Sequence, residues 1–153
     1  MKLPPLPIEG GCRCDRVRFR ISAVPLLAMA CHCRGCQRMT ASAYSLSLAI
    51  PADGFAVTAG ETVLGGLHAD GQPHHHCDWC KSWLFTDLAT AMGFVNVRAT
   101  LLDDPSWTMP FVETCTGEAL PWAATGARHS YPRFPPEDAF PALVEGYRAA
   151  ITA

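Results

Sequence analysis

Cys31-His32-Cys33-Arg34-Gly35-Cys36 is the largest of three cysteine groups in the sequence, and two shorter groups accompany it, Cys12-Arg13-Cys14 and Cys77-Asp78-Trp79-Cys80. Seven of the eight cysteines fall in these three groups. A C-x-C or C-x-x-C pair lets one tight turn aim two thiolates at a single ion, which is the ligand spacing typical of zinc sites. The sequence therefore predicts a zinc protein.

The two outer groups predict a closed structural site. Two pairs supply four sulfurs, and four thiolates complete the tetrahedral coordination of a structural zinc. One pair precedes a predicted strand and the other lies on a turn between two predicted strands, so sheet pairing could bring them together. The preferred ligand set is Cys12, Cys14, Cys77 and Cys80, and a swapped pairing of the groups is the alternative.

The middle group predicts a second zinc, which makes two ions per chain. Its three sulfurs, from Cys31, Cys33 and Cys36, leave one position for water or substrate. Zinc held by three thiolates lowers the pKa of that fourth ligand, and a thiol suits the position because sulfur binds zinc and stays nucleophilic as a thiolate. In the alternative, a protein side chain closes the site; the candidates are His32, His68, His76, His129 and Cys115.

The remaining metal-type residues are predicted to be structural. Cys115 stands alone and is interpreted as a small core residue, as free cysteines usually are. The run His74-His75-His76 is interpreted as surface beside a turn, because strand alternation would put His75 opposite the other two. Three tryptophans, Trp83, Trp107 and Trp122, are expected in the core or in pocket walls.

Composition bounds the class of protein. At 153 residues and 49% hydrophobic content, the chain is predicted to form a single domain over residues 1–153 with a normal core. The segment MKLPPLPIEG has no signal-peptide pattern, so a cytoplasmic location is expected, where thiols stay reduced and favour metal over disulfides. The net charge of −2 provides no basic surface of the kind that binds nucleic acid. No apolar run is long enough to span a membrane.

The rest of the chain predicts mainly β structure. Residues 44–50 alternate between polar and apolar side chains and end at a turn, which is typical of a strand. Residues 61–68 and 72–77 flank Asp70-Gly71, a strong hairpin signal. Phe140, Leu143, Val144, Tyr147 and Ile151 recur at helical spacing and predict a C-terminal helix. Further strands are predicted at 16–21, 26–30, 82–86, 93–99 and 108–114, and one helical turn at 37–42.

From about Gly10 to Trp122, the order of these motifs resembles the glutathione-dependent formaldehyde-activating enzyme family, also called the centromere protein V family. The likeness rests on the C-x-C pair, then CHCRGCQRMTASAY, then CDWC, followed by Leu102-Asp103-Asp104-Pro105 and Pro121-Trp122. The resemblance implies a mainly β, zinc-containing Mss4-like β-sheet domain with a short C-terminal helix. The motifs occupy about residues 10–122, and residues 123–153 form a C-terminal extension.

The resemblance also implies roles. It assigns Cys12, Cys14, Cys77 and Cys80 to a structural zinc, and Cys31, Cys33 and Cys36 to a catalytic zinc. The implied activity is that of a carbon–sulfur lyase resembling S-(hydroxymethyl)glutathione synthase, which joins the thiol of glutathione to formaldehyde. The implied partner is thus a small thiol. A second hypothesis is a non-catalytic, zinc-stabilised binding module for a protein partner.

Three positions depart from the family pattern. Members usually have glycine after the second cysteine of each structural pair, where this chain has Asp15 and Lys81. Lysine enters the left-handed region less readily than aspartate, so the second turn is expected to differ from the first. Ala41 likewise replaces a frequent glycine beside the open site.

Overall fold

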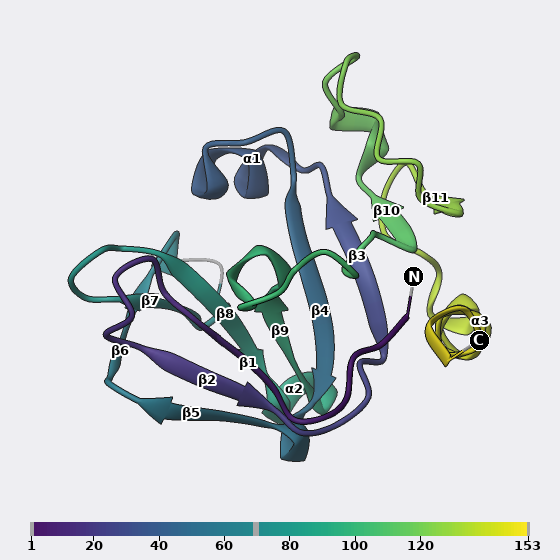
Figure 1. Ribbon diagram of the computed structural model, residues 1–153. Coiled ribbons are helices and arrows are strands. Elements are labelled where there is room, and N and C mark those ends of the chain that lie inside the picture. The colour runs from purple at the N-terminus through teal and green to yellow at the C-terminus, as the bar shows by residue number, and fades with distance from the viewer. Residues whose placement is uncertain (1, 69–70, 153) are drawn as a thin grey trace.

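The computed structural model describes residues 2–68 and 71–152 of the chain. Within these residues there are two sheets (Figure 1), one of three strands in the order β1-β2-β5 and one of eight in the order β11-β10-β3-β4-β9-β8-β7-β6. The strands are β1 (Ile8–Gly11), β2 (Arg18–Ile21), β3 (Leu27–Cys31), β4 (Ser45–Pro51), β5 (Phe55–Ala59), β6 (Thr62–Gly65), β7 (His74–Cys77), β8 (Trp83–Leu88), β9 (Phe94–Arg98), β10 (Val112–Thr114) and β11 (His129–Ser130). The helices are α1 (Arg34–Thr40), α2 (Ala89–Met92) and α3 (Phe140–Thr152). The predicted mainly β fold with a short C-terminal helix is confirmed.

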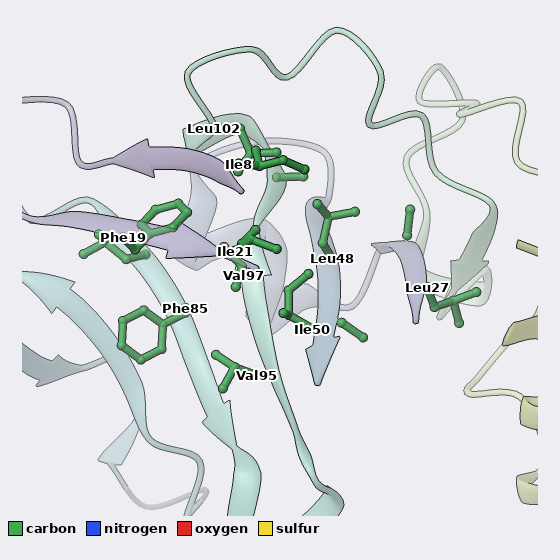
Figure 2. Close-up of a cluster of buried hydrophobic side chains, with 14 of the residues drawn as sticks. Ile8, Phe19, Ile21, Leu27, Leu48, Ile50, Phe85, Val95, Val97 and Leu102 are labelled. Carbon is green, nitrogen blue, oxygen red and sulfur yellow. The ribbon is translucent and has the colours of Figure 1, made fainter. Parts of the chain in front are cut away.

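The hydrophobic core lies between the two sheets (Figure 2). Phe19 and Ile21 of β2 are fully buried, as are Leu48 of β4 and Val97 of β9. Phe55 connects the sheets, because its ring lies 5.7 Å from the Phe19 ring and 4.8 Å from the Phe85 ring, centroid to centroid. Burial of these side chains is the main force that holds the sheets together.

Strand β1 was not predicted from the sequence, because it contains two glycines, Gly10 and Gly11. The same glycines allow it to pack closely against its neighbours. Glycine weakens a strand and gives no alternation to recognise. A Cβ on Gly10 would lie 2.5 Å from the Phe19 ring and 2.6 Å from the Leu101 carbonyl oxygen. Only glycine lets the backbone approach so closely. Strand β5 was also missed, and four of its five residues are exposed.

The other face of the large sheet is polar but buried. By register, Cys31 of β3 pairs with Ser45 of β4, Ser47 pairs with Arg98 of β9, and Asn96 pairs with Thr86 of β8. Side chains at paired positions share a face. This set, Cys31, Ser45, Ser47, Asn96, Arg98 and Thr86, is called the polar face below. Ser45, Ser47, Thr86 and Arg98 are each at most 6% exposed.

A bulge in β8 adds an aromatic residue to this polar face. The β7–β8 pairing shifts from His75↔Phe85 to His76↔Trp83, which leaves Leu84 as the extra residue. Phe85 therefore turns to the core, where it stacks on His75. Trp83 turns the other way and contacts His74 and His76. The three histidines alternate as predicted, but His74 is buried, so the surface interpretation was wrong for it.

Helix α1 begins earlier than the predicted turn at 37–42, because a cysteine caps it. The Cys33 side chain accepts a hydrogen bond from the Cys36 backbone N–H at the helix N-terminus. The helix ends at Ala41, which has a left-handed φ of 49°. The loop from Cys31 to Ala41 thus crosses from β3 back toward β4.

Helix α3 packs beside β3 at the far edge of the large sheet (Figure 1). Its buried residues, Leu143, Tyr147 and Ile151, follow the predicted spacing. None of the helices in the described ranges is long and apolar enough to cross a membrane.

The other predicted strands are confirmed with altered bounds: β3 and β4 are shifted by one residue, β8 is longer than predicted, and the rest are shorter. The hairpin is present as β6 paired antiparallel with β7, although its turn residues Ala69 and Asp70 lie outside the described residues. Residues 108–114 form a strand only at Val112–Thr114. That strand pairs parallel with β3, next to the central cysteine group.

Candidate metal centres

The first candidate centre gathers four thiols from two loops. Cys12 and Cys14 follow β1, while Cys77 ends β7 and Cys80 follows it. All four sulfurs lie within 4.8 Å of one another. The Cys12 Sγ to Cys14 Sγ distance is 3.5 Å, and the Cys14 Sγ to Cys77 Sγ distance is 3.8 Å. This group, the four-thiol cluster, is the set that the sequence favoured, and a tetrahedral ion suits such a donor set.

The two turns of the four-thiol cluster differ in length by one residue, but each ends in a left-handed residue directly after its second cysteine. The backbone N–H of Asp15 donates to the Cys12 carbonyl, and the N–H of Lys81 donates to the Cys77 carbonyl. Asp15 has a φ of 57° and Lys81 a φ of 58°. Lys81 thus adopts the left-handed conformation that lysine was expected to resist. A left-handed backbone at a lysine carries a strain cost, which the surrounding fold offsets here.

Hydrogen bonds prepare this cluster for an ion. The Val17 backbone N–H donates to Cys12 Sγ over 3.3 Å. Burial raises the pKa of the Cys80 thiol and hydrogen bonds from Ser82 lower it, which leaves that pKa at about 6. Thiolate, the form that binds metal, is thereby favoured at Cys80. The Arg16 backbone lowers the pKa of Cys14, but burial and the neighbouring thiols outweigh it and raise that pKa to about 11.

The second candidate centre, the three-thiol cluster, comes from one short segment. Cys31 ends β3, Cys33 caps α1 and Cys36 lies in its first turn. Their sulfurs also lie within 4.8 Å of one another. The Cys36 thiol donates to Cys31, and this hydrogen bond, outweighing burial, lowers the pKa of Cys31 to about 5, while that of Cys36 is raised. Three sulfurs with one in its thiolate form are a donor set that suits zinc.

Among the described residues, none of the proposed closing ligands joins the three sulfurs within that distance. His32 is buried and its Nε2 lies 3.3 Å from Glu113 Oε2. His76 stacks on Trp83, and His129 packs on Phe111. Cys115 is buried as predicted and hydrogen-bonds to Cys31; burial and the Cys31 charge raise its pKa to about 12. It is thus held as a neutral thiol beside the cluster. The exposed His68 also lies outside the cluster.

A small cavity, the inner cavity, adjoins the three-thiol cluster. Its volume is about 110 Å³, and Cys31 and Cys36 line it together with the polar face. Arg98 forms part of this wall and is buried, with its guanidinium 3.9 Å from the centre of the Trp83 ring. Burial lowers the pKa of Arg98 to about 10, opposed by the charges of Cys36 and Cys31, so the side chain stays cationic at neutral pH.

A larger depression, the outer groove, lies on the other side of the Trp83–Arg98 pair. Its volume is about 980 Å³, and both residues also line it. Arg13 and Lys81 add positive charge, and its lining contains no aspartate or glutamate. Trp122 stands 75% exposed in its wall, as a pocket-wall tryptophan would. Such a groove favours an anionic ligand with some apolar surface.

Sequence reasoning did not find Arg98 or the inner cavity. Nothing in Val95-Asn96-Val97-Arg98 marks the arginine as buried, although alternation correctly places Val95 and Val97 in the core. The pairing of β9 with β4 carries Arg98 into the same wall as Cys31. Three-dimensional pairing, not local pattern, brings it to the site.

One family model, that of the glutathione-dependent formaldehyde-activating enzyme, matches residues 7–118. The chain belongs to this family. The match includes all seven clustered cysteines, and the resemblance drawn from their spacing is confirmed.

A solved structure supports the fold of this family member. The crystal structure of a Rhodobacter sphaeroides protein, a structural genomics target, is similar with a TM-score of 0.52 at 17% identity. The similar region covers 63% of this chain and 88% of that chain. No curated protein matches the chain.

Proposed function

We propose that this protein is a zinc-dependent enzyme that forms or breaks a carbon–sulfur bond between a thiol and a small carbonyl compound. The observation that carries the proposal is the three-thiol cluster, which opens onto a cavity and has no fourth ligand among the described residues. The membership of the family supports glutathione and formaldehyde as the pair of substrates. By this proposal the chain is a carbon–sulfur lyase of the S-(hydroxymethyl)glutathione synthase type.

The two clusters are assigned different tasks. Cys31, Cys33 and Cys36 would hold a catalytic zinc, which supplies a Lewis acid that keeps a fourth ligand deprotonated at neutral pH. Cys12, Cys14, Cys77 and Cys80 would hold a structural zinc, whose four positions they fill. Two ions per chain are thus expected.

The chain's residues would orient the thiol. The outer groove offers Arg13 and Lys81 to the carboxylates of a peptide thiol such as glutathione, and the exposed Trp122 offers an apolar surface. The thiol gives up its proton to solvent, its sulfur lone pair forms the bond to the carbonyl carbon, and the π pair of the C=O bond moves to oxygen. That oxygen takes a proton from solvent, so thiol and aldehyde combine without an oxidant or reductant.

The test is the rate at which the adduct appears. Purified protein is mixed with glutathione and ¹³C-formaldehyde, and exchange NMR compares the rate with the spontaneous reaction. We expect Cys33→Ser to remove the acceleration, because serine keeps the helix cap but removes a thiolate. Cys115→Ser is the matched variant, since it removes a neighbouring thiol outside the set of three, and it is expected to stay close to wild type.

Two results would contradict the proposal: no acceleration by wild-type protein, or full acceleration by Cys33→Ser. The alternative of a non-catalytic binding module is not favoured, because two of the three thiols face a cavity.

A further inference from the structure

The wall of the inner cavity combines buried polar side chains with the apolar side chains of Met29, Trp83 and Phe134. Residues from four adjacent strands, β3, β4, β9 and β8, bring the polar face to one wall by register. Polar residues on a sheet usually point to water. Here they are buried around about 110 Å³ of space next to Cys31 and Cys36.

Three polar atoms in this wall have no hydrogen-bond partner in the described part of the chain. They are Trp83 Nε1, Asn96 Oδ1 and Arg98 Nε, and each is buried. The Ser45 hydroxyl, in contrast, hydrogen-bonds to Cys36. Native proteins satisfy the large majority of buried polar atoms. Three unpaired atoms around one cavity indicate that an occupant supplies the missing partners.

The positive charge of Arg98 favours an occupant that carries or develops negative charge. It is only 6% exposed and forms no ion pair within residues 2–68 and 71–152. It contacts the Asn96 carbonyl oxygen, which lies 3.2 Å from its terminal nitrogen Nη2, and the Trp83 ring. A buried cation is costly without negative charge nearby. The thiolates supply part of it, and the unpaired Nε leaves a donor for an oxygen that gains negative charge.

The size of the cavity limits the occupant. About 110 Å³ holds roughly four water molecules at about 30 Å³ each. A one- or two-carbon aldehyde fits this space, whereas glutathione does not and would need the outer groove. The Trp83–Arg98 pair lies between the two spaces, because both residues line both.

We propose that the inner cavity binds the small carbonyl electrophile and that Arg98 is a catalytic residue, which donates hydrogen bonds to the carbonyl oxygen as it becomes an oxyanion. This proposal rests on the proposed function. As sulfur bonds to the carbonyl carbon, the π pair moves to the oxygen that Arg98 faces, and that oxygen then takes a proton from solvent while Arg98 keeps its own. The cavity restricts the reaction to small aldehydes.

The test uses the zinc-loaded, full-length protein and formate, a small anion that imitates the charged oxygen. Calorimetry measures formate binding, and NMR measures adduct formation, in wild type and in Arg98→Met, which removes the charge and keeps an apolar stem for Trp83. Arg148→Met, an exposed arginine on α3, is the matched control. Ser47→Val, opposite Arg98 in the β4–β9 register, narrows the cavity and leaves the arginine in place.

We expect Arg98→Met to weaken formate binding at least about 10-fold and to lower kcat about 100-fold or more, the loss typical of removing an oxyanion donor. Its zinc content and its KM for the thiol should match wild type. Ser47→Val should weaken formate binding without loss of zinc, and Arg148→Met should change neither quantity.

The proposal and the proposed function fail in different ways. If wild type accelerates the reaction but Arg98→Met binds formate and turns over as wild type does, the assignment of the cavity is overturned alone. Loss of zinc or of thiol binding in Arg98→Met would also overturn the assignment, because Arg98 would then act on the cluster. Unchanged formate binding by Ser47→Val would overturn it too, because the anion would then bind elsewhere. If wild type gives no acceleration, the proposed function falls, and the electrophile assignment with it.

Discussion

The four-thiol and three-thiol clusters use the same ligand but join very different parts of the chain. Cys14 and Cys77 lie 63 residues apart, and their cluster connects the loop after β1, in the small sheet, to the loop after β7, in the large sheet. The three-thiol cluster lies within the single segment Cys31–Cys36 at the end of one strand. A metal in the first would fasten two sheets together, whereas a metal in the second would leave the fold almost unaffected.

The clusters also differ in what surrounds them. The four-thiol cluster supplies all the ligands that a tetrahedral ion needs, with backbone N–H groups around its sulfurs. The three-thiol cluster supplies three ligands, and it adjoins the inner cavity, which has Arg98 in its wall. The two clusters therefore differ in the number of thiols and in the buried polar side chains near them. The first suits a structural metal, and the second suits a catalytic one.

The largest expected effect comes from breaking the long-range cluster. Cys77→Ser should lower the free energy of unfolding by about 4 kcal/mol or more, because structural metal binding is coupled to folding and its loss ranks among the most damaging substitutions. Cys33→Ser should lower it by less than about 1 kcal/mol. Urea unfolding of both variants, with zinc content measured on the same samples, checks the difference. Equal losses in the two variants would remove the distinction between the clusters.

A smaller effect is expected where the three-thiol segment meets β10. Glu113 Oε2 accepts a hydrogen bond from Thr125 over 2.7 Å and lies 3.3 Å from His32 Nε2. Burial raises the pKa of Glu113, but these hydrogen bonds outweigh it and lower that pKa below its ordinary value. Glu113→Gln should therefore cost about 1 kcal/mol at neutral pH.

The sign of the pH dependence follows from that lowered pKa. A carboxylate with a depressed folded-state pKa stabilises the fold above its unfolded pKa and loses this contribution as pH falls through the folded value. Unfolding of wild type and Glu113→Gln should therefore differ at neutral pH and converge in acid. A difference that grew on acidification would show that Glu113 acts in another way.

The smallest effect concerns the left-handed residues. Lys81→Gly should raise the free energy of unfolding by about 1 kcal/mol, because glycine adopts the φ of 58° without a Cβ clash. Asp15→Gly should gain less, since aspartate tolerates this region and its ion pair with Arg18 would be lost. Thermal melting of both variants at fixed zinc checks the order. Destabilisation by Lys81→Gly would mean that its contact with Asp78 outweighs the strain.

Cysteine spacing predicted the separate pairs and the three-thiol group, because ligands on one turn are a local property. The union of Cys12 and Cys14 with Cys77 and Cys80 depended on sheet pairing, and a swapped pairing stayed open until the structure brought these four together. The alternation in residues 44–50 likewise predicted β4. Strand β1 escaped prediction because Gly10 is selected for close approach to Phe19 and not for β propensity. The bulge at Leu84, which turns Trp83 onto the polar face, has no signal in the sequence.

The inner cavity was beyond sequence reasoning for a related reason. Arg98 and Cys31 meet through two strand pairings, β9 with β4 and β4 with β3, and neither pairing is a local property. Cys115 reaches Cys31 through the parallel pairing of β10 with β3 in the same way. The assignment of metals to both clusters stays a prediction.

The most direct test of the contrast between a closed and an open site is cobalt substitution followed by titration with glutathione. Cobalt absorption reports the ligands of each ion, and the Cys33→Ser variant provides the spectrum of the four-thiol cluster alone. We expect two cobalt ions per wild-type chain. Glutathione should change the thiolate-to-cobalt absorption of one of these ions, and this change should be absent from Cys33→Ser. A wild-type spectrum that glutathione leaves unchanged would contradict the account, because both sites would then be closed.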